Sequence, residues 1–483
     1  MFIPSRATLI LAICFAVISI LFYKYADYAD GDLDVVERNI IKSWTKFVRP
    51  PKKQFKKLAV GVNSNIDIIV PGVALLDALS ISPGDKKNHD VLGGLRDLQE
   101  TFAYYFARGS AAERSFTDSE VFQKIIKAAG RLNNIQHFIG GNAALMATKA
   151  SNLFPSLRIH FVGPVGPLLQ TLMPVAIEIP NSCRIPQDEI HLIMEYKVGE
   201  QWGSATSPVA NRFITSHDLS NAQIIMLEPF FESIKTFQPD LIILSGFQIL
   251  DSQGPEFFKE RLDKAVSLLR EVPPSVPIHL ELASMADKEF VKQIIDKIVP
   301  NVDSLGLNEQ EIVFSSKASD GPHHDHFDHD EHGQPEIHVI SDIILWFLQN
   351  YGYSSKNPDA RLTRIHFHSL TYHIVAVVES HWSNVEQATA AGTQVAGHQA
   401  CDIPQLKAEL MELQIPLRFK LFSGDEERVF DGNNPVLSWR KDGYLFVFSP
   451  VLVCKNPTKT VGLGDAISAT GLMFSEFHPR SNV

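Results

Sequence analysis

Cysteine is scarce in this chain of 483 residues, which has four, at Cys14, Cys183, Cys401 and Cys454. So few and so widely spaced cysteines exclude a disulfide-rich scaffold, and they exclude a structural zinc site built from closely spaced pairs. Basic residues are also in the minority, because 44 Lys and Arg against 55 Asp and Glu give a formal net charge of −11. This balance argues against a nucleic-acid partner, since binding a polyanion requires clustered Lys and Arg. Small anionic ligands remain compatible, because a few donors at a helix N-terminus are enough to hold them.

One apolar run, residues 7–23, lies near the N-terminus between Arg6 and Lys24. It is short for a spanning helix and slightly long for a cleaved signal, so a signal peptide over residues 1–24 and a retained signal anchor both remain open. A helix of the globular core is the less compatible alternative, because no polar residue interrupts the run to form a solvent face. We therefore expect the body of the protein in the secretory pathway, either in the lumen of the endoplasmic reticulum, anchored or soluble, or secreted.

The expected compartment bears on the cysteines of the C-terminal third. An oxidising lumen allows Cys401 and Cys454 to form a disulfide, and two buried free thiols are the alternative. Residues 25–57 carry an acidic stretch and then a basic, proline-broken stretch, and neither has a clear apolar face. We predict a solvated tether there, with contact between its lysines and anionic lipid headgroups as the alternative.

Buried strands alternate with amphipathic helices along the globular part of the chain. Apolar runs predict strands at residues 57–70, 158–166, 240–250, 277–284, 304–308 and 362–378. Apolar residues three and four apart predict helices at residues 119–132, 140–154, 255–272 and 287–299. This alternation predicts an α/β fold with three layers, in which helices cover both faces of a mostly parallel sheet. Ligands are expected beyond the C-terminal ends of its strands.

Two segments depart from this alternation. Residues 190–203 and 210–218 read as alternating strands joined through a Gly turn, which predicts a small antiparallel sheet. We assign them to a smaller α/β lid, formed roughly by residues 68–120 and 180–217, that excludes water from a reaction site. Residues 316–336 are polar and rich in His, which predicts a disordered loop, with a weak divalent-metal site as the alternative.

The residues with the clearest chemical signature lie near the C-terminus, where Gly462, Leu463, Gly464 and Asp465 precede a predicted helix. Two glycines let the backbone approach a phosphate closely, and the helix offers free N–H groups. The carboxylate beside them is placed to take a proton from an acceptor hydroxyl. On its own this pattern is also compatible with a helix N-cap that follows a Gly turn.

Four further groups of polar residues follow predicted strands or open predicted helices in a fixed order. They are Asn63, Asn65 and Asp67; Gly140, Gly141 and Asn142; His279 and Glu281; and Asn308 and Glu311. With the Gly462–Asp465 motif, this order resembles the ribokinase-like superfamily. The H-x-E and N-E-x-E combination, the lid insertion and the length resemble the ADP-dependent glucokinases over roughly residues 55–480, and the N-terminus is similar to that of the animal branch.

The resemblance implies a role for each matched residue. Asp465 matches the base that deprotonates the sugar hydroxyl, and the backbone from Gly462 to Gly464 matches the anion hole. Arg212 resembles the lid arginine that reaches the nucleotide phosphates, a task that suits its forked guanidinium. A surface salt bridge is the alternative for Arg212.

The implied cofactor is Mg²⁺. Glu281 and Glu311 match the acidic residues that hold it, mostly through water, together with Asp465, while Asn308 and His279 lie beside them. This fits the preference of Mg²⁺ for a few carboxylates and phosphate oxygens.

The implied sugar site lies mostly in the lid. Asn65 and Asp67 match the first motif of the family, and Glu113 resembles a sugar-binding glutamate that follows a run of small residues. Gly141 and Asn142 are expected to line the sugar. A helix-surface glutamate is the alternative for Glu113, and a helix N-terminal turn is the alternative for the Gly141–Asn142 pair.

The resemblance implies an ADP-specific glucokinase, with a kinase domain over residues 58–480, that transfers the β-phosphoryl group of ADP to glucose and yields glucose 6-phosphate and AMP. No residue establishes ADP over ATP on physical grounds, so a related kinase with another donor or sugar remains open. A luminal sugar- or nucleotide-binding protein without turnover is the alternative from another class. Glucose and ADP are the expected partners, and a monomer is the expected state.

Overall fold

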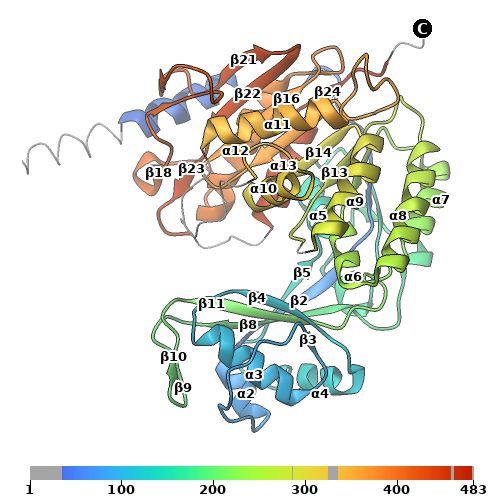
Figure 1. Cartoon of the computed structure of the whole chain (residues 1–483), viewed down its shortest axis with the longest axis vertical. Coiled ribbons are helices and arrows are strands. Elements are labelled where there is room, and N and C mark those ends of the chain that lie inside the picture. Colours follow the sequence, from blue (N-terminus) through green and yellow to red (C-terminus); the bar gives the residue numbers. More distant parts are fainter. Residues whose placement is uncertain (1–34, 286, 325–335, 458–461, 481–483) are drawn as a thin grey trace, which may run out of the picture.

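A computed structural model describes residues 35–285, 287–324, 336–457 and 462–480. The predicted signal segment and the centre of the His-rich loop lie outside the described residues. Two lobes are visible in Figure 1, a larger one above and a smaller lid below. None of the helices in the described part of the chain is long and apolar enough to cross a membrane.

The larger lobe is built on a ten-stranded sheet with the order β21-β22-β16-β15-β14-β13-β12-β1-β6-β7. The run from β15 to β7 is parallel throughout, and β16, β22 and β21 extend it as antiparallel strands. The strands are β1 (Lys57–Gly61), β6 (Arg158–Val162), β7 (Ile177–Glu178), β12 (Leu241–Leu244), β13 (Ile278–Glu281), β14 (Ser304–Leu307), β15 (Arg364–His368), β16 (Tyr372–Val377), β21 (Leu437–Lys441) and β22 (Tyr444–Pro450). The predicted mostly parallel sheet is therefore confirmed.

Helices cover both faces of this sheet. One face carries α5 (Asn142–Leu153), α12 (Val385–Cys401) and α13 (Leu463–Met473). The other carries α7 (Leu227–Phe237), α8 (Pro255–Arg270), α9 (Lys288–Gln293), α10 (Glu309–Ala318) and α11 (Ile337–Tyr351), while α6 (Pro167–Leu172) lies near the lid. Because both faces are covered, the central strands are apolar without interruption, and in β12 Ile242 and Leu244 join one core cluster while Leu241 and Ile243 join the other.

The strands nearest the site keep this alternation but make one face polar. In β13, Ile278 and Leu280 face the apolar cluster on the α7–α11 side, whereas His279 and Glu281 point the other way. These short strands contain no Pro, and their polar residues at alternate positions are available for function because they do not pack in the apolar cluster.

The lid is formed by residues 65–140 and 190–216 around a six-stranded sheet with the order β3-β4-β11-β8-β2-β5. Its strands are β2 (Asn65–Pro71), β3 (Val91–Leu92), β4 (Ala112–Phe116), β5 (Gln136–Gly140), β8 (Ile190–Tyr196) and β11 (Asn211–Ser216). Its helices α2 (Gly72–Ala78), α3 (Leu95–Phe106) and α4 (Ser119–Ala129) lie beneath the sheet, so the opposite face is turned toward the larger lobe (Figure 1).

The antiparallel pair predicted for the lid is confirmed, because β8 pairs antiparallel with β11. This pair is part of a larger mixed sheet, since β8 also pairs parallel with β2. Two other predictions about these segments were wrong. The first lid segment ends near residue 140 rather than 120, because the helix predicted at 119–132 packs in the lid as α4. The single strands predicted at 57–70 and 362–378 are each two strands, since polar residues or a turn interrupt them.

The chain passes four times between the two sheets: at residues 62–64, at Gly141, between β7 and β8, and between β11 and α7. Short two-stranded sheets complete the fold. They are β9 (Gln201–Trp202) with β10 (Ala205–Thr206), β17 (Trp382–Ser383) with β24 (Glu476–Phe477), β18 (Met411–Leu413) with β23 (Leu452–Cys454), and β19 (Arg418–Phe419) with β20 (Arg428–Val429).

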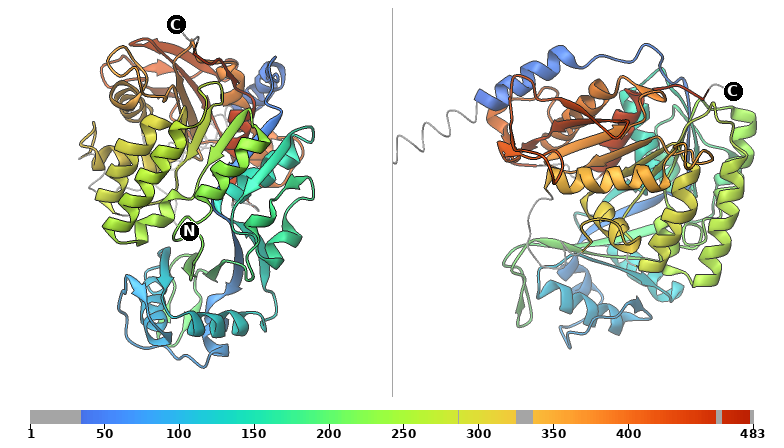
Figure 2. Two further views of the ribbon diagram at one scale, coloured as in Figure 1. Left: turned by 90° about the vertical axis from the view of Figure 1, so that its right-hand side faces the viewer. Right: turned by 45° about the horizontal axis from the view of Figure 1, so that its top comes forward.

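Residues 35–47 form a helix, where the sequence predicted part of a tether over residues 25–57. The helix lies on the larger lobe beside the C-terminal segments (Figure 2), and it buries Ile40 and Trp44 completely. The apolar residues are spaced four apart, and the charged residues between them concealed this stripe in the sequence.

A buried hydrogen bond fixes the same helix from its polar side. The Glu37 carboxylate accepts the backbone N–H of Leu413 in β18 over 3.0 Å. Close by, Cys401 and Cys454 form a disulfide, the first of the two alternatives. The start of the predicted His-rich loop is ordered, because α10 continues to Ala318.

Candidate active site

The larger lobe presents Glu281 at the C-terminal end of β13 with both carboxylate oxygens engaged. His279 Nε2 lies 2.9 Å from Oε2, and His368 Nε2, from β15, lies 2.9 Å from Oε1. Ser304 Oγ lies 2.9 Å from His279 Nδ1 and so fixes the ring from behind. Burial alone would raise the pKa of Glu281, but the two imidazoles lower it to about 2. These two hydrogen bonds hold the Glu281 carboxylate in place and favour its ionised form.

Glu311 and Asn308 are joined by a capping box at the start of α10. The Asn308 side-chain oxygen accepts the N–H groups of Gln310 and Glu311, at 2.9 and 3.1 Å. In return, the Glu311 carboxylate accepts the backbone N–H and the side-chain Nδ2 of Asn308, both over 2.8 Å. The N-x-x-E spacing thus has a physical reason, because it locks one carboxylate at the sheet edge. Burial raises the pKa of Glu311 to about 7.

Asp465 lies in the first turn of α13 and is 6% exposed. Asn142 Nδ2 donates to Asp465 Oδ1 over 3.1 Å, and Gln248 Nε2 donates to Asn142 Oδ1 over 3.2 Å. Burial, and then the charge of Glu281, raises the pKa of Asp465 to about 7. A carboxylate with such a pKa is suited to exchange a proton near neutral pH.

Two glycines shape the backbone around this carboxylate. Gly462, the N-cap of α13, has φ of 66°, and Gly141, the N-cap of α5, has φ of 81°, both in the left-handed region that favours glycine. A Cβ on Gly141 would lie 2.7 Å from Ser64 Cα, and one on Gly464 would lie 3.2 Å from His368 Cε1. The N-termini of α5 and α13 can therefore lie close to Asp465, because the glycines at these positions have no side chain.

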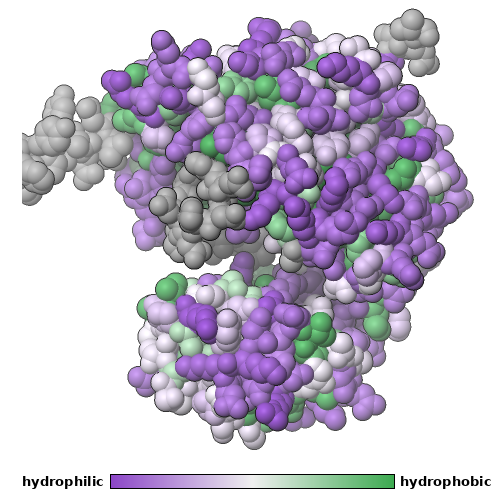
Figure 3. Space-filling view, in the orientation of Figure 1, coloured by the Kyte–Doolittle hydropathy of each residue, from purple (hydrophilic) through white to green (hydrophobic). Residues whose placement is uncertain are grey.

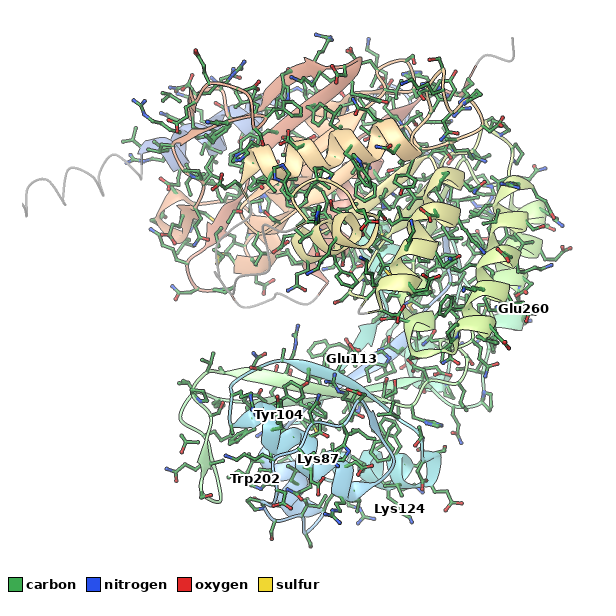
Figure 4. The ribbon with its side chains drawn as sticks, in the orientation of Figure 1. Lys87, Tyr104, Glu113, Lys124, Trp202 and Glu260 are labelled. Atoms are coloured by element: carbon green, nitrogen blue, oxygen red, sulfur yellow. A yellow bond between two sulfur atoms is a disulfide. The ribbon has the colours of Figure 1, made fainter. Side chains whose placement is uncertain are left out.

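The lid places its predicted residues on the face of its sheet that is turned toward the larger lobe. Along each strand every second side chain packs on the lid helices, as Ile66, Leu192 and Phe213 do. The residues between them share the open face. These are Asn65 and Asp67 in β2, His191 in β8, Arg212 in β11 and Glu113 in β4. Figure 4 labels Glu113 on this side of the lid.

A histidine links the acidic residues of the open face. His191 Nδ1 lies 3.8 Å from the Glu113 carboxylate, and His191 Nε2 lies 2.8 Å from the Asp218 carboxylate. Burial alone would lower the pKa of His191, but Asp218 outweighs it and raises the pKa to about 10. Asn65 Nδ2 donates to Asp67 Oδ1 over 2.6 Å. The face is thus a set of charged donors and acceptors around an imidazolium.

Arg212 is exposed on this face and forms no ion pair with any residue that the structure describes. Its positive charge is close enough to act on the Asp67 carboxylate. The surface salt bridge considered as an alternative is not formed among the described residues. The guanidinium remains available to an anion that enters the space between the lobes.

Two local interpretations change with the structure. Glu113 lies in strand β4 rather than on a helix surface, so the helical alternative was wrong. Asn63, which precedes Asn65 and Asp67 in the first motif, uses its side-chain oxygen to accept the N–H of Ala143 over 3.1 Å. It therefore caps α5 and positions the adjoining Asn142.

The described residues contain no group of three or more His, Cys, Asp or Glu side chains placed to bind one metal ion directly. Glu281 nevertheless acts electrostatically on both Glu311 and Asp465, so the three carboxylates are neighbours. Carboxylate oxygens that accept one hydrogen bond keep a second lone pair. This set fits a Mg²⁺ ion that retains several of its own waters, and not a cage of direct ligands.

The arrangement has a match among known protein families. The conserved region described as ADP-specific phosphofructokinase/glucokinase matches residues 56–474. The chain belongs to this family. The family predicted from the five motifs is therefore confirmed.

Relatives of known name share the family with this chain. A Bos taurus protein named ADP-dependent glucokinase is 44% identical over 449 residues, which cover 92% of this chain and 89% of that protein. A Caenorhabditis elegans protein named probable ADP-dependent glucokinase is 40% identical over 490 residues, covering 99% and 97%. A solved phosphofructokinase from Pyrococcus horikoshii OT3 with AMP has a TM-score of 0.64 at 20% identity, covering 87% and 98%. This last likeness shows a shared fold.

The structure adds residues that the motifs did not reveal. His368, Gln248, His191, Asp218 and Glu189 all contact predicted site residues or one another. Only His191 had a visible signal, because it occupies an open-face position in an alternating strand. His368, Gln248 and Asp218 reach the site from other segments. Glu189 lies two residues before His191, but no motif marks it.

Proposed function

We propose that this chain is an ADP-dependent glucokinase, which transfers the β-phosphoryl group of ADP to glucose and yields glucose 6-phosphate and AMP. The observation that carries the proposal is the position of Asp465, buried at the N-terminus of α13 and oriented by Asn142. Free N–H groups at a helix N-terminus stabilise a phosphoryl group in transfer, and the carboxylate beside them takes the proton of the sugar hydroxyl. The names of the relatives at 44% and 40% identity support the same reaction.

The lid offers groups that suit a sugar. Asp67 and Glu113 place two carboxyl groups on the open face, and Asn65 adds an amide beside them. Carboxylates and amides are good partners for sugar hydroxyls. Glucose, and not the substrate of a phosphofructokinase, is proposed from the names of the relatives at 44% and 40% identity.

Mg²⁺ is the proposed cofactor, held by Glu281, Glu311 and Asp465 largely through water. When bound, it neutralises charge on the phosphates of the donor. Asn308 locks Glu311, and His279 locks Glu281, so the residues that meet the hydrated ion do not reorganise when it arrives. Arg212 contributes a second cation from the lid.

The proposed location is the secretory pathway, with residues 1–24 as signal peptide or anchor. The Cys401–Cys454 disulfide supports an oxidising compartment, where such bonds persist. A monomer is the proposed active unit, because one chain supplies both halves of the site.

Glucose 6-phosphate formation by the full-length chain tests the function, with Mg²⁺ present and ADP or ATP as the sole donor. The Asp465→Asn variant serves as the matched control, because it keeps the shape of the side chain but removes the base. We expect activity with ADP, and a loss of about 10³-fold or more in kcat in the variant with glucose binding retained.

Each alternative has its own outcome in this assay. Activity with ATP alone would leave Asp465 as the assigned base but overturn the assignment of ADP as the donor. Absence of activity with either donor, together with glucose binding, would favour a sugar-binding protein without turnover. Near-normal turnover of Asp465→Asn would overturn the assignment of the base.

A further inference from the structure

Each half of the site is linked electrostatically mainly to its own lobe. Glu281 and His368 of the larger lobe act on the pKa of Asp465, whereas His191, Glu113 and Arg212 of the lid act on the pKa of Asp67. Figure 3 shows a hollow between the two lobes. A phosphoryl transfer that uses both halves therefore requires the lobes to approach each other.

The crossings between the lobes are tied together by buried polar groups. Asn221 Nδ2 donates to the Ser64 carbonyl over 2.9 Å, and the Ser64 N–H donates to Asn221 Oδ1 over 3.3 Å. These contacts join the crossing after β11 to the crossing between β1 and β2. Any closing motion has to bend both segments together.

Glu189, the residue immediately before β8, ties a third crossing to these two. Its carboxylate accepts the N–H groups of Leu219 and Ser220 over 2.9 and 2.8 Å, and its backbone carbonyl accepts the N–H of Ile66 over 2.8 Å. Glu189 is 7% exposed, so these bonds are made away from water. The buried Glu189 residue thus connects three of the four crossings between the lobes.

Asp218 connects this hinge to the sugar face. It lies in the crossing after β11, bonds His191 over 2.8 Å, and faces the Glu189 carboxyl group. Two ionised carboxyl groups that are buried close together repel each other. Burial, and then the charge of Asp218, raises the pKa of Glu189 to about 7, so the repulsion is relieved when Glu189 takes up a proton near neutral pH.

We propose that Glu189 and Asp218 are positioning residues that couple sugar binding on the lid to closure of the two lobes. The path runs from the open face through His191 to Asp218, then to Glu189 and the backbone of the crossings. The inference rests on the proposed function, because the ligand that starts the coupling is the sugar held beside His191. A residue that only stabilised the fold would not need to face a second carboxyl group.

The experiment measures the radius of gyration by small-angle X-ray scattering, with and without saturating glucose, together with glucose affinity by calorimetry. Glu189→Ala and Asp218→Asn are compared with the wild-type chain. The matched control is Asp240→Ala, because the Asp240 carboxylate also accepts two backbone N–H groups, from Lys56 and Lys57 over 2.9 and 3.0 Å, but within the larger lobe.

We expect the wild type and Asp240→Ala to become more compact when glucose binds. Glu189→Ala and Asp218→Asn are expected to bind glucose about 5–100-fold more weakly, because the free energy of coupling is lost. At saturating glucose they should stay extended and show a kcat reduced by roughly tenfold or more. Asp218→Asn keeps the size of the side chain, so it carries the test if Glu189→Ala does not fold.

The outcomes separate this inference from the proposed function. Compaction of both hinge variants to the wild-type extent would overturn the coupling alone. Glucose binding by the wild type without any compaction would do the same. A wild-type chain that binds no glucose would overturn the proposed function and the inference with it.

Discussion

The two halves of the site hold their functional groups in opposite ways. In the larger lobe, Glu281, Glu311 and Asp465 are 3%, 6% and 6% exposed, and each is fixed by a side-chain hydrogen bond. In the lid, the Glu113 side chain is 57% exposed and Arg212 is exposed as well. The larger lobe thus holds its carboxylates by buried hydrogen bonds, whereas the lid presents two exposed charged groups beside the bonded pair of Asn65 and Asp67. A preorganised half lowers the reorganisation cost of phosphoryl transfer, and an open half lets substrates enter.

This difference predicts that a substitution among the buried carboxylates of the larger lobe lowers both kcat and the free energy of unfolding. Glu281→Ala should lower kcat by about 10³-fold, through loss of the metal-site carboxylate. It should also lower the free energy of unfolding by about 3–5 kcal/mol, because His279 and His368 lose their buried acceptor. Steady-state kinetics and urea unfolding measure the two effects.

The control for this variant is Glu379→Ala, which removes an exposed carboxylate paired with Arg440 at 2.7 Å. It should cost less than about 1 kcal/mol and leave kcat unchanged. Wild-type stability of Glu281→Ala would contradict the view that this half is preorganised by its buried bonds.

A substitution of an exposed site residue of the lid should lower activity and leave the free energy of unfolding nearly unchanged. Arg212→Ala is expected to lower kcat/KM for ADP by about 10–100-fold, the value of one charge-assisted contact. The free energy of unfolding should change by less than about 0.5 kcal/mol, because the residue is exposed. Arg108→Ala, which removes a lid arginine stacked on Tyr104, is the matched control and should leave ADP kinetics intact. Unchanged kinetics of Arg212→Ala would remove it from the nucleotide site.

The pH dependence sharpens the comparison, because Asp465 must lose its proton to act as the base. With a pKa of about 7, deprotonation predicts that kcat falls by about tenfold per unit below pH 7. Stability follows the opposite sign: a carboxyl group with a raised pKa in the folded state favours folding below its ordinary pKa of 3.8, and this advantage is lost as pH rises toward 7.

The measurement is a pH series of kcat and of metal-free unfolding for the wild type and Asp465→Asn. The variant should remove part of the decline in stability between pH 4 and 7. An activity profile that is flat from pH 5 to 8 would contradict Asp465 as the titrating base.

The smallest effect is expected at Glu113. Glu113→Gln should raise KM for glucose by about tenfold, with kcat and stability near wild type, because one exposed hydrogen bond to a charged group is weakened. Glu120→Gln, at an exposed glutamate of α4 in the same lid, is the control and should leave KM unchanged. A fall in kcat without a change in KM would place Glu113 in the chemistry rather than in sugar binding.

The same contrast explains what the sequence could predict. The three carboxylates of the larger lobe were predictable because they lie at strand ends or helix starts, where a short motif indicates both the residue and its position. They are Asp465, Glu281 and Glu311. Central strands of the larger sheet were predictable because burial on both faces makes them continuously apolar. These features depend on local spacing alone.

Features that depend on register or on distant segments were not predictable. His368 reaches Glu281 only because β15 and β13 flank β14, and Asp218 reaches His191 only through the pairing of β11 with β8. The helix at residues 35–47 escaped prediction because its apolar stripe is narrow and is masked by neighbouring charges. In each case the missing information lies in tertiary packing.

The docking of this N-terminal helix also sets an order of events during synthesis. Glu37 bonds Leu413, which lies 376 residues later in the chain. At about 5–20 residues per second, a ribosome needs roughly 20–75 s to make that stretch. Both lid segments emerge within this interval, while Trp44 has no surface to pack against. Synthesis from the N-terminus therefore makes this helix one of the last parts of the fold to dock, so the burial of Trp44 reports that the segment around Leu413 has been made and folded.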